Sequence, residues 1–387
     1  MGVTSPRGFV AAGVPCGIKP WGQPDLALVA TADRRPVAAA GVFTSNKATA
    51  APVLASADHL AATAGRAAAV VLNSGNANAC TGAPGRADAE RTCALVAEQL
   101  GCRPEHVLVC STGLIGIPLA MGAVEAGIAP LATALAADGG AAAAEAIRTT
   151  DTVRKEVRVD AGPFTVGGMA KGAAMLAPSM ATMLAVLTTD AVADPDVLAD
   201  ALRSGVAGSF NSLLVDGATS TNDTVLLLAS GSSRRRDDAA LTESVAAACT
   251  DLARQMGSDA EGATKLVEVR VTGAASDDDA RRAARAVAGS LLCKCSWYGG
   301  DPYWGRVVSE LGSAGVAFDP GTVSVAYGDV TVCRDGVAAE HDAAALEKTM
   351  AARDLLVAAD LGLAAGAATV LTCDLTHGYV DENKGTS

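Results

Sequence analysis

Short apolar runs alternate along the chain with longer stretches in which apolar residues recur every three or four positions. The first pattern is typical of buried strands and the second of amphipathic helices. Strands are predicted for residues 68–72, 107–110, 156–160, 164–166, 183–187, 225–229, 266–271 and 368–374, with a hairpin at 323–332. Helices are predicted for residues 86–100, 121–137, 194–205 and 241–256, with one more beginning at Ser276 or Asp277. The mixed order, without a clear internal repeat, predicts an α/β fold of mixed sheets layered with helices.

A proline followed by an apolar run places one threonine at the start of a predicted buried strand. Pro178 interrupts regular structure, and the apolar run 183–187 follows it closely. Thr182 is therefore expected where a loop enters the strand. Elsewhere, Gly101 and Gly257 are expected to end helices, and Ser111, Thr112 and Gly113 are expected to form a tight turn after the strand 107–110.

Composition and charge narrow the class of protein. The chain has 387 residues, is half hydrophobic but only 3% aromatic, and carries a formal charge of -12. Such an acidic chain is a poor partner for nucleic acid or an anionic membrane surface. No stretch has the ~18 uncharged apolar residues of a membrane helix, and the first residues do not resemble a signal peptide. A cytoplasmic enzyme for small polar metabolites is expected.

Cysteine spacing and glycine motifs argue against a bound metal or nucleotide cofactor. The ten cysteines are scattered through apolar stretches, as in proteins of a reducing compartment, and no two pairs have the spacing of a zinc site. The glycine-rich segment before Lys171 lacks both the GxxxxGK[ST] and the GxGxxG spacing. We therefore predict neither a metal nor a cofactor.

A threonine at a strand entrance can act as a nucleophile only if a base is available. No serine, histidine and acid arrangement is evident in the chain, so the simplest base is the α-amino group of Thr182 itself. Cleavage of the bond between Ala181 and Thr182 would free that amine, which has a pKa of ~7.7 to 8 and can remove the hydroxyl proton. Without further support, a threonine that merely begins a core strand is the more common situation.

Long motifs supply that support. The segment KGAAMLAPSMATMLAVLTTDA from Lys171 resembles the processing segment of the ornithine acetyltransferase family, also called bifunctional glutamate N-acetyltransferase. The resemblance extends through GVFTSNKATAAPV, VLNSGNANACTG, STGLIGIPL, SFNSLLVDGATSTNDT, EGATK, KCSWYGGDPYWGR and TCDLTHGYV, in this order. In that family the chain cleaves itself before the threonine of the ATML run. The resemblance thus implies an α chain of residues 1–181 and a β chain of residues 182–387, as intertwined halves of one fold.

The resemblance also implies residues for the reaction. Thr182 is the expected nucleophile, and Thr112 and Gly113 match the residues that hold the oxyanion of the tetrahedral intermediate. A glycine at a strand end leaves its backbone N–H open to a ligand, which suits that role. Without the resemblance, Ser111, Thr112 and Gly113 would be expected to form only an ordinary tight turn after a strand.

Substrate contacts follow from the charges of the implied substrates and from the family motifs. Lys171 is expected to contact substrate, because both N-acetylornithine and glutamate present an α-carboxylate. Glu261 is the expected partner of the ornithine ammonium, and Thr149 and Asn383 complete the set with a C-terminal hydroxyl residue. The chain ends YVDENKGTS, without the tyrosine usual in the family and one residue short. Ser387 is taken for the last contact, with Thr386 as the alternative.

The implied activity is transfer of acetyl from N-acetylornithine to L-glutamate through an acetyl-threonine ester, with acetyl-CoA left open as a second donor. The implied assembly is a heterotetramer of two α and two β chains. Alternatives are a self-cleaving aminopeptidase or amidohydrolase with the same nucleophile, and a paralogous acetyltransferase of specialised metabolism. An uncleaved amino-acid-binding protein is the alternative outside enzymes.

Overall fold

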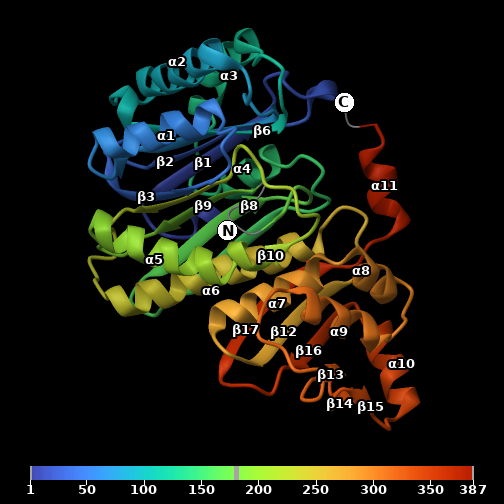
Figure 1. Cartoon of the computed structure of the whole chain (residues 1–387). Helices are drawn as coiled ribbons and strands as arrows, with labels where there is room; N and C mark the ends of the chain where they lie inside the picture. Colours follow the sequence, from blue (N-terminus) through green and yellow to red (C-terminus); the bar gives the residue numbers. More distant parts are fainter. Residues whose placement is uncertain (1, 178–182, 386–387) are drawn as a thin grey trace. The chain divides into compact units, whose positions relative to one another are not determined.

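The computed structural model describes residues 2–177 and 183–385, and these divide into two compact units (Figure 1). Unit 1 comprises residues 1–211 and 218–256, and unit 2 comprises residues 212–217 and 257–387. The predicted halves are divided elsewhere, between residues 181 and 182, which lie outside the described residues. The proposed cleavage point therefore falls inside the span of unit 1.

The first sheet of unit 1 carries a helical layer on its outer face, drawn in blue and cyan in Figure 1. Its strand order among the described residues is β1 (Phe9–Val14), β2 (Leu26–Thr31), β5 (Ala69–Asn76) and β6 (Val107–Leu114). Strand β5 pairs with β2 antiparallel and with β6 parallel. The covering helices are α1 (Ala51–Ala62), α2 (Gly82–Leu100) and α3 (Met121–Thr133). Buried alanines, valines and leucines of these strands and helices form one core between the two layers.

The second sheet of unit 1 contains the strand that follows the proposed cleavage point. Its order among the described strands is β4 (Arg66–Ala67), β3 (Val37–Phe43), β11 (Thr224–Ala229), β9 (Leu184–Thr189), β8 (Thr165–Lys171) and β7 (Lys155–Asp160). A second core, which also includes residues of α4 (Gly140–Ala146), lies between this sheet and the first. Helices α5 (Pro195–Gly208) and α6 (Asp238–Ser258) lie over its other face, where Leu252 approaches Gly168 of β8 (Figure 1). Unit 1 thus stacks helices, two sheets and helices.

Unit 2 is built on one mixed sheet. Its order in the described part of the chain is β10 (Leu213–Leu214), β17 (Gly366–Cys373), β12 (Leu266–Ala274), β16 (Asp354–Asp360), β13 (Ser324–Tyr327), β14 (Val330–Arg334) and β15 (Val337–Ala338). Its helices are α7 (Asp277–Gly289), α8 (Leu291–Tyr298), α9 (Trp304–Ser313), α10 (Ala343–Ala351) and α11 (His377–Asn383). Helix α7 packs on β12 and β17, and its N-terminus is capped by the Ser276 hydroxyl, which accepts the Asp279 N–H. Short 3-10 helices occupy residues 2–4, 20–22, 104–106 and 210–212.

The predicted α/β class and the layering of mixed sheets with helices are confirmed, and three local predictions are corrected. Ser111, Thr112 and Gly113 belong to β6, because pairing with β5 continues to Leu114, so they form no turn after the strand. Gly257 lies inside α6 and does not end it. The helix predicted for 121–137 ends at Thr133, and the small-residue stretch after it contains α4. Gly101 does follow α2, with the left-handed φ of 69° that favours glycine at a helix end.

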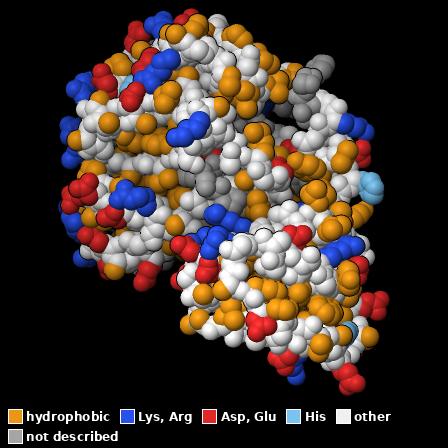
Figure 2. Space-filling model, in the orientation of Figure 1, with side chains coloured by type: hydrophobic (Ala, Val, Ile, Leu, Met, Phe, Trp, Pro, Cys, Tyr) orange, Lys and Arg blue, Asp and Glu red, His pale blue; other side chains and the backbone are white. Residues whose placement is uncertain are grey.

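Figure 2 shows basic and acidic side chains interspersed on the face it presents. Within residues 2–177 and 183–385, no helix combines the length and apolar character required to cross a membrane, and no group of three or more metal-ligating side chains gathers. All ten cysteines are free thiols.

Candidate functional site

The end of β6 brings Thr112 and Gly113 against the neighbouring strand β5. Gly113 has a φ of 132°, and a Cβ placed on it would lie 2.3 Å from the Gly75 carbonyl carbon and 2.4 Å from the Asn76 nitrogen. The pairing register shifts at Gly75 and Asn76, which marks a bulge in the ladder. Glycine at position 113 is therefore required both by the backbone angle and by the close approach of β5.

Side chains from other segments fix the end of β6 in place. The Ser111 hydroxyl donates to Asn73 Oδ1 at 2.6 Å, which links β6 to β5. The Asn222 amide donates to the Ala77 carbonyl at 2.6 Å and to the Ser111 carbonyl at 2.9 Å. Because the Ser111 carbonyl belongs to the peptide that precedes Thr112, this amide fixes the orientation of the chain where the predicted oxyanion residues begin.

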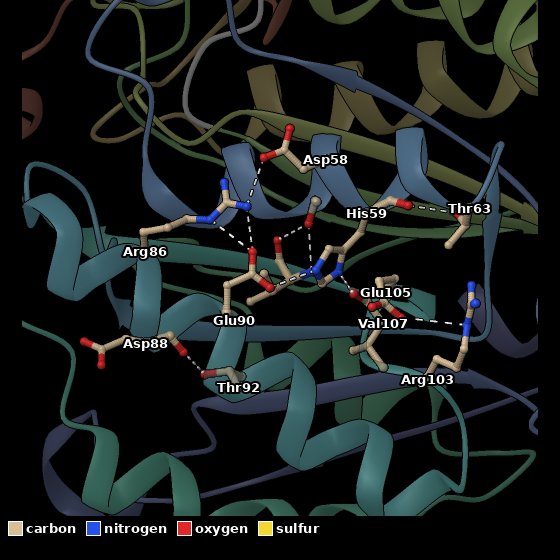
Figure 3. Close-up of polar contacts among 12 residues, drawn as sticks. Asp58, His59, Thr63, Arg86, Asp88, Glu90, Thr92, Arg103, Glu105 and Val107 are labelled. Carbon is tan, nitrogen blue, oxygen red and sulfur yellow. Dashed lines mark hydrogen bonds and ion pairs between the residues drawn. The ribbon is translucent and has the colours of Figure 1, made fainter.

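The helical side of β6 is anchored by a second polar group. The Ser56 hydroxyl donates to the Val109 carbonyl at 2.7 Å. Figure 3 shows His59 of α1 between β6 and α2, with Nδ1 at 2.8 Å from the Val107 carbonyl and Nε2 at 2.9 Å from a Glu90 carboxylate oxygen. Both nitrogens of the His59 ring therefore have a polar partner. These contacts hold α1 on the strand that carries Thr112.

Lys171 is the last residue of β8, and its side chain reaches Thr112 at the end of β6. Its side chain is buried, and Nζ lies 3.3 Å from the Thr112 hydroxyl oxygen. The next residue, Gly172, donates its N–H to Asp151 Oδ1 at 2.7 Å, and the fully buried Lys155 ammonium donates to the same oxygen at 2.6 Å. Burial alone would raise the pKa of Asp151, but the charges of Lys171 and Lys155 outweigh it and hold that pKa below its ordinary value. Asp151 is therefore a carboxylate that fixes the backbone after Lys171.

Thr149 joins this arrangement through the backbone. Its N–H donates to Asp151 Oδ2 at 3.1 Å, so one carboxylate contacts both the Thr149 and the Gly172 segments. The Lys19 ammonium donates to the carbonyl of Arg148 at 2.5 Å. The charge of Lys171 affects the pKa of both Lys19 and Asp151, which places the predicted Thr149 and Lys171 in one electrostatic neighbourhood.

A small pocket opens beside Thr112 and Gly113, the predicted oxyanion residues. Residues of four segments of unit 1 line it: Ala77, Thr112, Gly113, Ile115, Met175, Ser220, Thr221 and Asn222. Thr112 and Gly113 thus lie on the wall of a concave site, as a reacting carbonyl requires. The rest of the lining combines the apolar side chains of Ala77, Ile115 and Met175 with the polar side chains of residues 220–222.

The predicted cleavage site, Ala181 and Thr182, lies outside the described residues, but the residue after it is described. The Met183 N–H donates to Asp223 Oδ1 at 2.8 Å, and Met183 leads directly into β9. Burial raises the pKa of Asp223 well above its ordinary value, while the Met183 N–H, the charge of Lys171 and the Ser220 hydroxyl lower it. A buried carboxyl group therefore lies at the start of β9, close enough to Lys171 for the lysine charge to lower its pKa.

In unit 2, two predicted substrate residues contact each other. The Asn383 amide of α11 donates to Glu261 Oε2 at 2.6 Å, and Glu261 is largely buried. The Gly262 N–H donates to Glu382 at 3.1 Å, which adds a second link between α11 and the EGATK segment. Ser387 and Thr386 lie outside the described residues, so the prediction for the last contact stays a prediction.

Sequence reasoning missed three polar residues of this neighbourhood: Asp151, Asn222 and Asp223. Each was visible only as part of a motif, TTDT or STNDT, and each acts on a segment distant in sequence. A polar stretch directly before a buried strand was the available signal for Asn222 and Asp223. Such a stretch indicates a loop but does not predict which residues its side chains will bind.

Comparison with known proteins decides the family. The family model of the ArgJ family matches residues 10–385 of this chain. The chain belongs to the ArgJ family. An arginine biosynthesis bifunctional protein ArgJ from Symbiobacterium thermophilum is 47% identical, over 99% of this chain and 97% of the relative. One from Mycolicibacterium paratuberculosis is 50% identical, over 100% of this chain and 96% of the relative. The predicted family is confirmed.

A solved ArgJ structure matches only about half of this chain. The chain of the arginine biosynthesis bifunctional protein argJ from Bacillus halodurans is 35% identical with a TM-score of 0.50. The match covers 51% of this chain but 96% of the solved chain. The solved ArgJ chain is thus about half as long as the present one.

Proposed function

We propose that this ArgJ protein is a glutamate N-acetyltransferase that transfers acetyl from N-acetylornithine to L-glutamate. As a member of the ArgJ family it is an acyltransferase of arginine biosynthesis. The observation that carries the residue assignment is the approach of the buried Lys171 ammonium to the Thr112 hydroxyl at 3.3 Å. Two residues predicted separately, one for the substrate carboxylate and one for the oxyanion, are neighbours beside a pocket.

We assign the nucleophile to Thr182, after self-cleavage into α and β chains of residues 1–181 and 182–387. The half-length solved chain of the Bacillus halodurans relative supports the cleavage, because a whole chain of this family would extend over both halves. In each half-reaction the pocket beside Gly113 receives the reacting carbonyl. Substrate contacts are assigned to Thr149, Lys171, Glu261, Asn383 and Ser387.

The proposed chemistry has two balanced steps. In the first, the Thr182 amine takes the hydroxyl proton, the hydroxyl oxygen forms an ester with the acetyl carbon, and the amide C–N bond breaks. The proton passes to the departing amine, and ornithine leaves. In the second, the α-amine of glutamate forms the new amide bond, the ester C–O bond breaks, and the threonine oxygen regains a proton. Thr112 and Gly113 stabilise the oxyanion in both steps, where one donor is typically worth ~3 kcal/mol of barrier lowering.

We further propose a heterotetramer of two α and two β chains in the cytoplasm. Ten free thiols support a reducing compartment. The assembly follows the expectation for the family, and analytical ultracentrifugation of the purified protein tests it. Acetyl-CoA in place of N-acetylornithine tests the second donor.

The deciding experiment is the intact mass under denaturing conditions of wild type and Thr182→Ala, followed by acetyl exchange. We expect two wild-type fragments, one uncut variant chain, and acetyl transfer that requires glutamate. Release of ornithine at the same rate without glutamate would instead identify an amidohydrolase. A single uncut wild-type chain without turnover would refute the proposed function.

A further inference from the structure

The Thr112 hydroxyl contacts a cation that comes from the other sheet of unit 1. Both residues are buried, and Lys171 Nζ lies 3.3 Å from Thr112 Oγ1. Strand β6 of the first sheet carries the threonine, and strand β8 of the second sheet carries the lysine. Within residues 2–177 and 183–385, the contact with Lys171 is the one hydrogen bond of the Thr112 hydroxyl.

The chemistry of the two groups fixes the direction of this hydrogen bond. A lysine ammonium has three N–H donors and no acceptor, whereas a hydroxyl can both donate and accept. Thr112 Oγ1 therefore accepts from Lys171, and its own O–H hydrogen points away from the ammonium. No acceptor for that hydrogen lies among the residues that the structure describes. Because Thr112 lines the pocket beside Gly113, the O–H can donate to a group bound there.

Two carboxyl groups lie close enough to Lys171 to interact with its charge. Burial raises the pKa of Asp151 and of Asp223, and the charge of Lys171 counteracts this effect in both. A buried cation is tolerated where opposite charges are near it. These surroundings therefore suit the ammonium, which is the form of lysine that can only donate.

The backbones of both partners are held by hydrogen bonds from other segments. The Asn222 amide donates at 2.9 Å to the carbonyl directly before Thr112. Asp151 accepts, at 2.7 Å, the N–H of the residue directly after Lys171. Threonine is β-branched, so its χ1 angle has few accessible values. The contact between ammonium and hydroxyl is therefore set by the fold and needs no bound substrate.

We propose that Lys171 is a positioning residue that directs the Thr112 O–H into the pocket as an oxyanion donor. The ammonium occupies a lone pair of the hydroxyl oxygen, and the O–H then donates to the oxygen on which negative charge develops. The positive charge also polarises the hydroxyl, because linked hydrogen bonds strengthen one another. A donor aligned in advance stabilises the transition state without reorganisation. The inference rests on the proposed function and adds a second role to Lys171, beside its contact with the substrate carboxylate.

The two roles of Lys171 have different kinetic consequences. A contact with the substrate carboxylate is made in the ground state and in the transition state, so its loss raises KM. An aligned oxyanion donor acts only once the negative charge has developed, so its loss lowers kcat. The second role operates through Thr112 and disappears when that hydroxyl is removed, whereas the first role remains. A double-mutant cycle between the two positions therefore separates them.

Lys171→Met and Thr112→Val, alone and combined, form this cycle, because methionine is unbranched like lysine and valine keeps the shape of threonine. Lys265→Met is the matched control. Lys265 is also buried, and its ammonium donates to the Met350 and Ala352 carbonyls of unit 2 at 2.6 and 3.0 Å. Intact mass gives the fraction of cleaved chain, initial rates per cleaved chain give kcat and KM, and thermal unfolding gives stability.

We expect T112V to lose about 100-fold in kcat and K171M about tenfold, with no further loss of kcat when the two are combined. K171M should raise KM whether or not the Thr112 hydroxyl is present. K265M should lose stability and retain kcat.

An unchanged kcat in K171M, or losses in kcat that multiply in the double variant, would overturn the inference alone. An uncut and inactive wild type would remove the proposed function with it. If K171M did not fold, Lys171→Gln gives the same test, because the amide oxygen can accept the Thr112 hydrogen that the ammonium turns away. Loss of activity only in step with a lowered melting temperature, in the Lys171 and Lys265 variants alike, would identify a structural role and also overturn the inference.

Discussion

Gly113→Ala perturbs the candidate site through its backbone. A methyl group there would lie 2.3 Å from the Gly75 carbonyl carbon and 2.4 Å from the Asn76 nitrogen, distances that only a shift of β6 away from β5 can relieve. The φ of 132° is also one that alanine rarely adopts. Gly101→Ala is a control for the backbone angle alone, since its φ is 69° and no heavy atom lies within 4 Å of the added methyl.

The expected loss of stability is the sum of two costs, one for the backbone angle and one for the steric overlap with β5. Left-handed backbone costs an alanine roughly 1–2 kcal/mol, and overpacking costs about 1–3 kcal/mol. We therefore expect G113A to lose ~2–5 kcal/mol of the free energy of unfolding and G101A to lose ~1–2 kcal/mol. If the Gly113 N–H is an oxyanion donor, the shift also removes ~3 kcal/mol of transition-state stabilisation, about 100-fold in kcat.

Urea unfolding measures the first term, and initial rates of acetyl transfer measure the second. The kinetic effect should fall on kcat with KM little changed, because the oxyanion exists only in the transition state and intermediates. G113A with the stability of G101A would show that the close approach of β5 is unimportant. Full kcat in a destabilised G113A would refute the assignment of Gly113 to the oxyanion hole.

Three further changes test the surroundings of the site. Asp151→Asn breaks the buried ion pair between Lys155 and Asp151, and we expect ~3–5 kcal/mol less stability in urea at pH 7. Because the folded-state pKa of Asp151 is depressed, its contribution is complete above about pH 4 and is lost as pH falls below that, so the difference between wild type and D151N should shrink in acid. Asn383→Ala removes the donor to Glu261 and should raise the KM for N-acetylornithine more than it lowers kcat, measured by initial rates. His59→Leu leaves a buried β6 carbonyl unpaired and should cost ~1–3 kcal/mol in thermal unfolding with KM unchanged.

The sequence carried most of the information for strongly patterned segments. The hairpin at 323–332, the strand pair before Lys171 and the end of α2 at Gly101 are all present. The strands β1, β2 and β3 were not predicted, although β2 is buried throughout. Their alanine-rich runs do not distinguish strand from helix, because alanine is the best helix former and only pairing with neighbours decides.

The candidate site likewise contains residues that the sequence predicted and residues that it did not. Thr112, Gly113 and Lys171 were predicted from family motifs, and the structure brings them together at the ends of β6 and β8. Asp223 and Asn222 were not predicted, because their partners lie 40 and 111 residues away along the chain. Hydrogen bonds between distant segments leave no local periodicity, so such positioning contacts appear only once the chain is folded.

The arrangement of the sheet explains how a cut before residue 182 could leave a working site. Strand β9 pairs with β8 of the proposed α chain over six residues, from Lys171 and Leu184 to Val166 and Thr189. Strand β11 of the proposed β chain pairs with β3 of the α chain in the same sheet. The two fragments would therefore remain bound through two sets of strand hydrogen bonds and through the apolar core between the sheets of unit 1. They should copurify in native buffer and separate only in denaturant. Cleavage at this point changes the chemistry of residue 182 from amide to amine, while the strands that hold its neighbours keep their pairing.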